Sequence, residues 1–163
     1  MSYKVYPVTQ TELNYNGYEV KINGEKVTLD SARVSAMPFN RRWPGHQRQL
    51  DQTELVNFLS LETGEALHFE ITPCEKFEKV VIRPLSLGIV PEITEDGRIL
   101  FTLEKPAYFT VEPYGRHNAL HIFADPVSNY DVDKSDENVI YFGKGEHDAG
   151  MISYPPQYAL GQA

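Results

Sequence analysis

Apolar and polar residues alternate along most of this chain, a pattern that indicates strands with one buried and one exposed face. The alternation over residues 18–29 is interrupted by Asn23-Gly24. Asn-Gly between two alternating runs is the strongest short signal for a β-hairpin. A second hairpin is predicted within residues 89–103, where Asp96-Gly97 separates two further runs. Both hairpins predict antiparallel pairing between neighbouring strands.

Several other short runs are typical of strands. They cover residues 3–8, 32–37, 66–72, 80–82, 107–112, 119–124 and 139–142. In the run at 66–72, Leu67, Phe69 and Ile71 fall on one face, and His68 and Glu70 fall on the other. Because side chains alternate between the two faces of a strand, we expect the apolar three to be buried.

Residues 53–61 allow two interpretations. Asp51 and Glu54 have the spacing of a capping box, which would open a helix. Leu55, Asn57 and Leu59 can equally share one face of a strand. We favour the strand, because the other predicted elements are strands.

About ten short strands, separated by frequent Gly and Pro, predict an all-β fold, an antiparallel β-sandwich. A parallel sheet is not expected, because parallel neighbours require long crossover connections, usually helices. The length of 163 residues suits one domain with a buried core.

Composition narrows the choice of partners. The net charge of −8 repels phosphate backbones, so no nucleic-acid partner is predicted. No run approaches the roughly 18–20 apolar residues of a membrane helix, and no signal peptide is visible, so we predict no membrane partner and a cytoplasmic location. The one cysteine, Cys74, is expected to be a small buried apolar residue. No Gly-rich phosphate loop occurs, and no cofactor is predicted.

The irregular segment 39–51 contains the only tryptophan and is the predicted carbohydrate-binding site. Its candidate residues are Arg42, Trp43, His46, Arg48 and Asp51. An indole can stack on a sugar, and the polar side chains can bind hydroxyls or, through a bidentate Arg, uronate carboxylates. The alternative carries more weight: Trp43 fills the rim of the sandwich while Arg48 and Asp51 hold the loop.

The sequence gives less support for a metal site or a catalytic site than for carbohydrate binding. His117 and His121 would lie roughly 13 Å apart on a strand, too far to share an ion. We therefore expect these two, and His147 beside Asp148, to be structural. Asp131 and Asp133 have the spacing of a calcium loop, but the glycine and the final glutamate are out of place. The sequence contains no nucleophile motif, and nothing in it places two carboxylates at the separation that glycoside hydrolysis needs. No catalytic residue is therefore predicted.

Five segments together carry a resemblance to a known family. They are residues 31–40, 43–54, 81–86, 117–124 and 141–150. The last of them lies within 139–152, which has the Gly-rich pattern of a domain junction. They resemble the accessory β-sandwich that precedes a right-handed β-helix in polygalacturonase-like proteins of glycoside hydrolase family 28. The resemblance implies a β-sandwich accessory domain at 1–152 and, at 153–163, a tail at the start of a missing β-helix.

The family's catalytic motifs do not occur in this chain. Gly45-His46-Gln47 departs from Gly-His-Gly, and Arg98-Ile99-Leu100 departs from Arg-Ile-Lys. The resemblance therefore implies a non-catalytic domain that caps a β-helix catalytic domain, covers its strand edges, and contacts oligo- or polysaccharide through the Trp43 loop. Two alternatives stay open: a self-sufficient carbohydrate-active enzyme using the loop from Trp43 to Asp51, and a homo-oligomeric interaction domain that associates with itself.

Overall fold

A computed structural model describes residues 3–8, 13, 15–36, 49–128 and 132–142. The chain divides into one compact unit at Met1–Ser128 and a second at Asn129–Ala163. The strands of the first unit are β1 (Tyr3–Val5), β2 (Tyr18–Ile22), β3 (Glu25–Val27), β4 (Asp30–Ser35), β5 (Thr53–Thr63), β6 (Leu67–Pro73), β7 (Val81–Arg83), β8 (Glu92–Ile93), β9 (Ile99–Leu103), β10 (Tyr108–Arg116) and β11 (Leu120–Pro126). Two short 3₁₀ helices, η1 (Leu50–Gln52) and η2 (Leu85–Leu87), complete the described elements.

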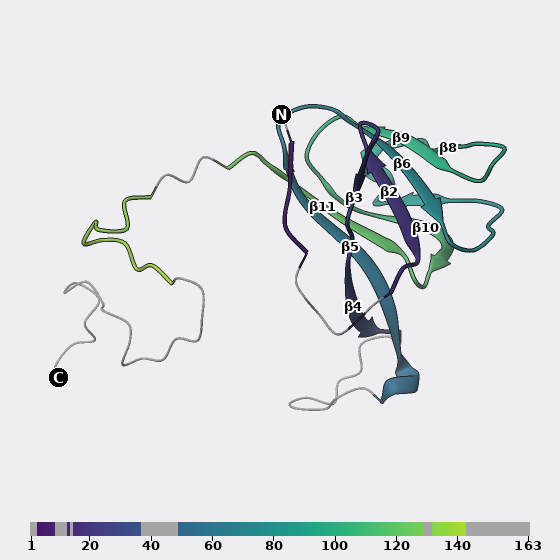
Figure 1. Ribbon diagram of the computed structural model, residues 1–163, viewed down its shortest axis with the longest axis horizontal. Coiled ribbons are helices and arrows are strands. Elements are labelled where there is room, and N and C mark those ends of the chain that lie inside the picture. The colour runs from purple at the N-terminus through teal and green to yellow at the C-terminus, as the bar shows by residue number, and fades with distance from the viewer. Residues whose placement is uncertain (1–2, 9–12, 14, 37–48, 129–131, 143–163) are drawn as a thin grey trace. The chain divides into compact units, whose positions relative to one another are not determined.

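The strands form two sheets (Figure 1). Sheet A has the order β1-β5-β11-β10-β7, with β4 also paired to β5, and sheet B has the order β3-β2-β6-β9-β8. The predicted all-β sandwich is confirmed. One pairing differs from the antiparallel expectation, because β11 runs parallel to β5 from Leu120 opposite Asn57 to Pro126 opposite Thr63. The chain between these two strands passes through β6 to β10, and so supplies the long connection that a parallel pair needs without a crossover helix.

The core lies between the inner faces of the two sheets. Leu67, Phe69 and Ile71 of β6 are buried, as their alternation predicts. The ring of Phe109, from sheet A, meets Phe69 and Phe101 of sheet B edge to face, with ring centroids 6.1 Å and 5.8 Å away. These contacts join the sheets through the geometry that aromatic pairs prefer.

Both predicted hairpins form. Asn23 and Gly24 have φ values of 50° and 84° between β2 and β3, the left-handed conformations that a tight two-residue turn requires. The second hairpin is shorter than predicted on its first strand, since β8 begins at Glu92. Pro91 stands directly before it and has no amide to donate to a ladder.

Residues 53–61 belong to a strand, β5, so the helical alternative is wrong. On its inner face Asn57 is a buried polar side chain, only 1% exposed. Its Oδ1 accepts from the Gly17 amide at 2.9 Å, and its Nδ2 donates to the Tyr15 carbonyl at 2.7 Å and the Asp30 carbonyl at 3.2 Å. Asn57 therefore ties the segment before β2 and the first residue of β4 to β5.

Two local predictions are wrong. Cys74 is exposed rather than buried, because it follows Pro73 at the end of β6, where the chain leaves the sheet. Residues 139–142, in the second unit, form no strand. The Val139 amide donates instead to the Asp136 carbonyl at 2.9 Å, which closes a turn. The predicted domain boundary at 152 lies outside the described residues.

The acidic loop of the second unit is held by its own turn hydrogen bonds. Asp133 accepts from the amide and the hydroxyl of Ser135 at 2.9 Å and 2.6 Å. Asp136 accepts from the Asn138 amide at 2.8 Å. Asp131 is not described. In the ranges given above, the structure has no helix with the length and apolar character needed to cross a membrane.

Candidate functional site

The predicted sugar-binding residues fall mostly outside the described ranges. Arg42, Trp43, His46 and Arg48 all lie in residues 37–48, which the structure does not describe. Asp51 is described: it is an exposed residue of η1, directly before β5. The sugar-binding role of this loop therefore stays a prediction.

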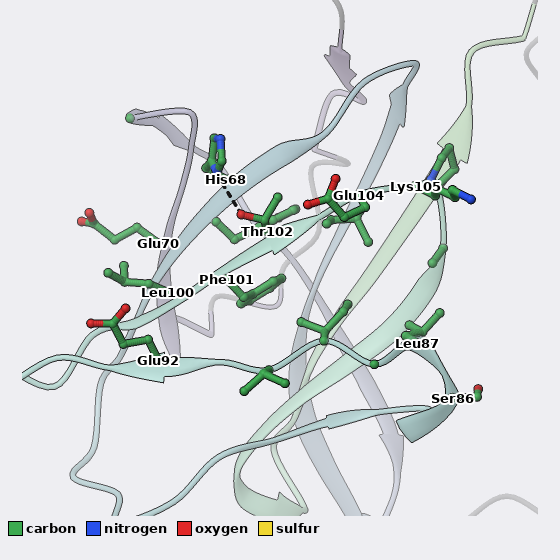
Figure 2. Close-up of a pocket in the computed structure, with 18 residues that line it drawn as sticks. His68, Glu70, Ser86, Leu87, Glu92, Leu100, Phe101, Thr102, Glu104 and Lys105 are labelled. Atoms are coloured by element: carbon green, nitrogen blue, oxygen red, sulfur yellow. Dashed lines mark hydrogen bonds between the residues drawn. The ribbon is translucent and has the colours of Figure 1, made fainter.

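A cleft with a volume of about 1030 Å³ opens beside sheet B, along β9 (Figure 2). One wall is made by residues of β6 and β9, and the other by residues between Ser86 and Glu92. The cleft exists because β8 pairs with β9 only at two positions, Glu92 with Leu100 and Ile93 with Ile99. Beyond Leu100 the segment before β8 departs from β9 and leaves space between them.

Strand register places two carboxylates at one end of this cleft. Glu70 of β6 pairs with Leu100 of β9, and Leu100 pairs with Glu92 of β8. Paired residues point to the same face, and strands lie about 4.8 Å apart, so Glu70 and Glu92 have Cα atoms about 10 Å apart. Figure 2 shows Glu70 and Glu92 on either side of Leu100, away from Glu104 and Lys105 at the other end.

Glu70 is held in its ionised form. The Lys21 ammonium lies 2.7 Å from one carboxylate oxygen, and the Arg98 guanidinium lies 3.0 Å from the other. The hydrogen bond from Lys21 is the main reason that the pKa of Glu70 falls below its ordinary value. A general acid for glycoside hydrolysis needs the opposite shift, towards neutral pH. Glu70 is therefore suited to accept hydrogen bonds rather than to protonate a leaving group.

The remaining lining is mixed in character. The His68 Nδ1 atom and the Thr102 hydroxyl share a hydrogen bond of 2.9 Å (Figure 2). Leu87 and Phe101 supply apolar wall, with Phe101 only 7% exposed. Such a combination of hydroxyl-binding groups and apolar surface can hold a small polar molecule.

The histidines predicted to be structural are separated in the fold. His117 follows β10, and its Nδ1 lies 2.9 Å from a carboxylate oxygen of Glu54. His121 lies on β11, where it pairs with Thr110 and Phe58. Among the residues that the structure describes, no three His, Cys, Asp or Glu side chains are grouped so that they could hold a metal ion. His147 and Asp148 lie outside those residues.

Comparison with known proteins shows the fold alone. No protein-family model matches the chain, and no curated protein matches it. Among solved structures, it is similar to Dex49A from Penicillium minioluteum, with a TM-score of 0.56 and 15% sequence identity. The match covers 78% of this chain and 33% of Dex49A, so the chain spans about a third of that protein's length.

Sequence reasoning did not find the cleft. It placed His68 and Glu70 correctly on the exposed face of β6. It gave no register between β6, β9 and β8, which is what brings Glu70, Leu100 and Glu92 into one row. The usable signal was the alternation itself, since it marks which polar side chains share an outer face.

Proposed function

We propose that this chain is a non-catalytic accessory β-sandwich of a carbohydrate-active protein, similar to the domain that precedes the β-helix in polygalacturonase-like enzymes. The observation that carries the proposal is the fold that 78% of this chain shares with 33% of Dex49A. The five sequence segments that resemble the polygalacturonase-like accessory domain support it independently.

The domain's role is to cover one end of a β-helix and to contact carbohydrate. A β-helix exposes unpaired strand edges at its first coil, and such edges promote aggregation unless they are covered. The coding DNA beyond codon 163 tests this role. The proposal predicts an in-frame β-helix sequence; a stop codon followed by no such sequence contradicts the covering role.

Carbohydrate contact is tested separately with the protein's single tryptophan, Trp43. Pectin fragments and neutral gluco-oligosaccharides are titrated into the chain while tryptophan emission is recorded. A saturable change supports contact at the loop, and calorimetric titration of Trp43→Phe with the same sugars should show weaker binding. An unchanged emission at millimolar ligand contradicts contact at that loop.

The non-catalytic part rests on the absence of the family's catalytic motifs from the sequence. In the cleft, the pKa of Glu70 is lowered, chiefly by the hydrogen bond from Lys21, so this carboxyl is not suited to act as a general acid. We expect no release of reducing ends from oligogalacturonides or gluco-oligosaccharides. Turnover that His46→Ala abolishes would instead support the enzyme alternative at the Trp43 loop.

A further inference from the structure

The outer face of sheet A carries a shallow trough. It lies over β7, β10 and β11 and has a volume of about 770 Å³. Three large apolar side chains in it are exposed: Leu85 by 68%, Tyr108 by 59% and Phe123 by 39%. Contiguous exposed apolar residues of this kind mark interaction sites more often than isolated ones do.

Strand register sorts the floor of the trough into two rows. Arg83, Thr110 and His121 pair across β7, β10 and β11 and form a polar row. Tyr108 pairs with Phe123 and forms an aromatic row. These rows are two residues apart along the strands, so they are neighbours on the same outer face.

The aromatic row is held in place by ring contacts. The Phe123 ring lies edge to face with Tyr108, at a centroid distance of 5.8 Å. It lies edge to face with Phe58 as well, at 6.4 Å, and nearly parallel to His121, at 6.5 Å and 18°. Rigid aromatic side chains lose little entropy when a ligand covers them.

The polar row can form hydrogen bonds with a ligand, and the positive charge of Arg83 in it is balanced by the Glu112 carboxylate. The Arg83 Nε donates to a Glu112 carboxylate oxygen at 3.2 Å, and the Thr110 hydroxyl donates to the other at 2.8 Å. Arg83 is 55% exposed at its side chain, so its terminal N–H groups can still reach a ligand. At the other end, the Tyr108 hydroxyl donates to the Asp125 carboxylate.

We propose that this trough binds a neutral oligosaccharide, with sugar C–H faces on Tyr108 and Phe123 and sugar hydroxyls on Arg83, Thr110 and His121. A sugar ring is apolar on its faces and polar around its edge, which matches one aromatic row beside one polar row. A uronate would meet the carboxylates of Glu112 and Asp125 in the trough and a net charge of −8 on the chain. Burial lowers the pKa of His121, and a neutral imidazole both donates to and accepts from hydroxyls.

This inference rests on the proposed function, because it names the ligand class and a second contact surface for the same domain. Isothermal titration calorimetry with isomaltohexaose, cellohexaose and hexagalacturonate tests it on the full chain. We expect saturable binding of at least one neutral hexasaccharide, and binding of hexagalacturonate at least tenfold weaker. Equal or tighter binding of hexagalacturonate overturns the neutral-ligand assignment.

Two variants locate the binding surface. Tyr108→Ala should weaken binding about tenfold, which corresponds to about 1.4 kcal/mol, because the ring supplies stacking area. Tyr141→Ala is the matched control, since Tyr141 is 57% exposed and belongs to the second unit; it should bind as the unaltered chain does. Thermal unfolding checks that both variants fold. If Tyr108→Ala does not fold, Thr110→Val tests the trough through its polar row instead.

The outcomes separate the two proposals. Sugar binding that survives Tyr108→Ala and Thr110→Val but fails in Trp43→Ala overturns the trough and leaves the accessory domain supported. Binding of none of the sugars overturns the trough and the carbohydrate contact together. Light scattering that shows a dimer dispersed by Tyr108→Ala overturns the trough as a sugar site, since the face would then join two copies.

Discussion

Asn57→Leu removes the buried polar contacts that join three segments of the sandwich. Asn57 is 1% exposed, and it satisfies the Gly17 amide at 2.9 Å and the Tyr15 carbonyl at 2.7 Å. Leucine has a similar volume but neither donor nor acceptor, so the Gly17 amide would be left buried without its partner, whereas the Tyr15 carbonyl would keep the Ser31 hydroxyl at 3.1 Å. An unsatisfied buried group of this kind costs about 1–3 kcal/mol.

Thermal unfolding followed by circular dichroism measures this loss. For a chain of this size, 1 kcal/mol shifts Tm by about 2–4 °C, so a decrease of roughly 2–12 °C is expected. Asn57→Ala should lose at least as much, because it also leaves a cavity. The control is Ser60→Ala on the opposite face of β5, where a change within about 0.5 kcal/mol is expected.

The comparison between the two Asn57 variants is the refuting test. If packing alone mattered, Asn57→Leu would restore most of the stability that Asn57→Ala loses. An Asn57→Leu chain as stable as the unaltered one would show that the hydrogen bonds to Gly17 and Tyr15 contribute nothing net.

Three further predictions concern single positions. The pKa of Glu70 is lowered in the folded chain, so its stabilising contribution is present above the ordinary value of 4.5 and is lost as pH falls through the lower folded value. Glu70→Gln should therefore lower Tm at pH 7 and leave it unchanged at pH 2; an equal loss at both would contradict the charge argument. Gly24→Ala should cost about 1–2 kcal/mol in urea unfolding, because its φ of 84° disfavours a Cβ, whereas Gly64→Ala should be near neutral; equal costs would be inconsistent with the turn geometry. Cys74 is exposed and should react fully with a thiol reagent without denaturant; reaction only after unfolding would contradict the structure.

Local signals account for the parts of the fold that the sequence predicted. Asn23-Gly24 specifies a turn through backbone conformations that few other residues adopt, and the turn forms. The alternation around Leu67 separates buried from exposed positions because side chains on a strand have a period of two. Both features need only neighbours along the chain, which explains why strand positions and the sandwich class could be predicted.

Long-range pairing could not be predicted in the same way. The parallel pairing of β11 with β5 joins residues that are more than sixty positions apart, such as Leu120 and Asn57, and no short pattern specifies it. The same holds for the row of Glu70, Leu100 and Glu92, which depends on the register of three strands. The candidate sites are built from such rows.

Aromatic residues at outward-facing strand positions could have indicated the trough from the sequence. Tyr108 and Phe123 occupy alternating strand positions on the side opposite the core. An aromatic residue there cannot be explained by burial between the sheets. Exposed aromatics at outward positions of two predicted strands were therefore a usable signal, although only the antiparallel register of β10 and β11 shows that they meet.

Native mass spectrometry of the chain mixed with a neutral hexasaccharide tests the central claim most directly, because one spectrum reports both binding and ligand integrity. The account predicts a one-to-one complex whose mass equals that of the chain plus the intact hexasaccharide, and no shortened sugar after prolonged incubation. A spectrum without any complex, or one that contains cleaved sugar, would contradict an accessory domain that binds carbohydrate without cutting it.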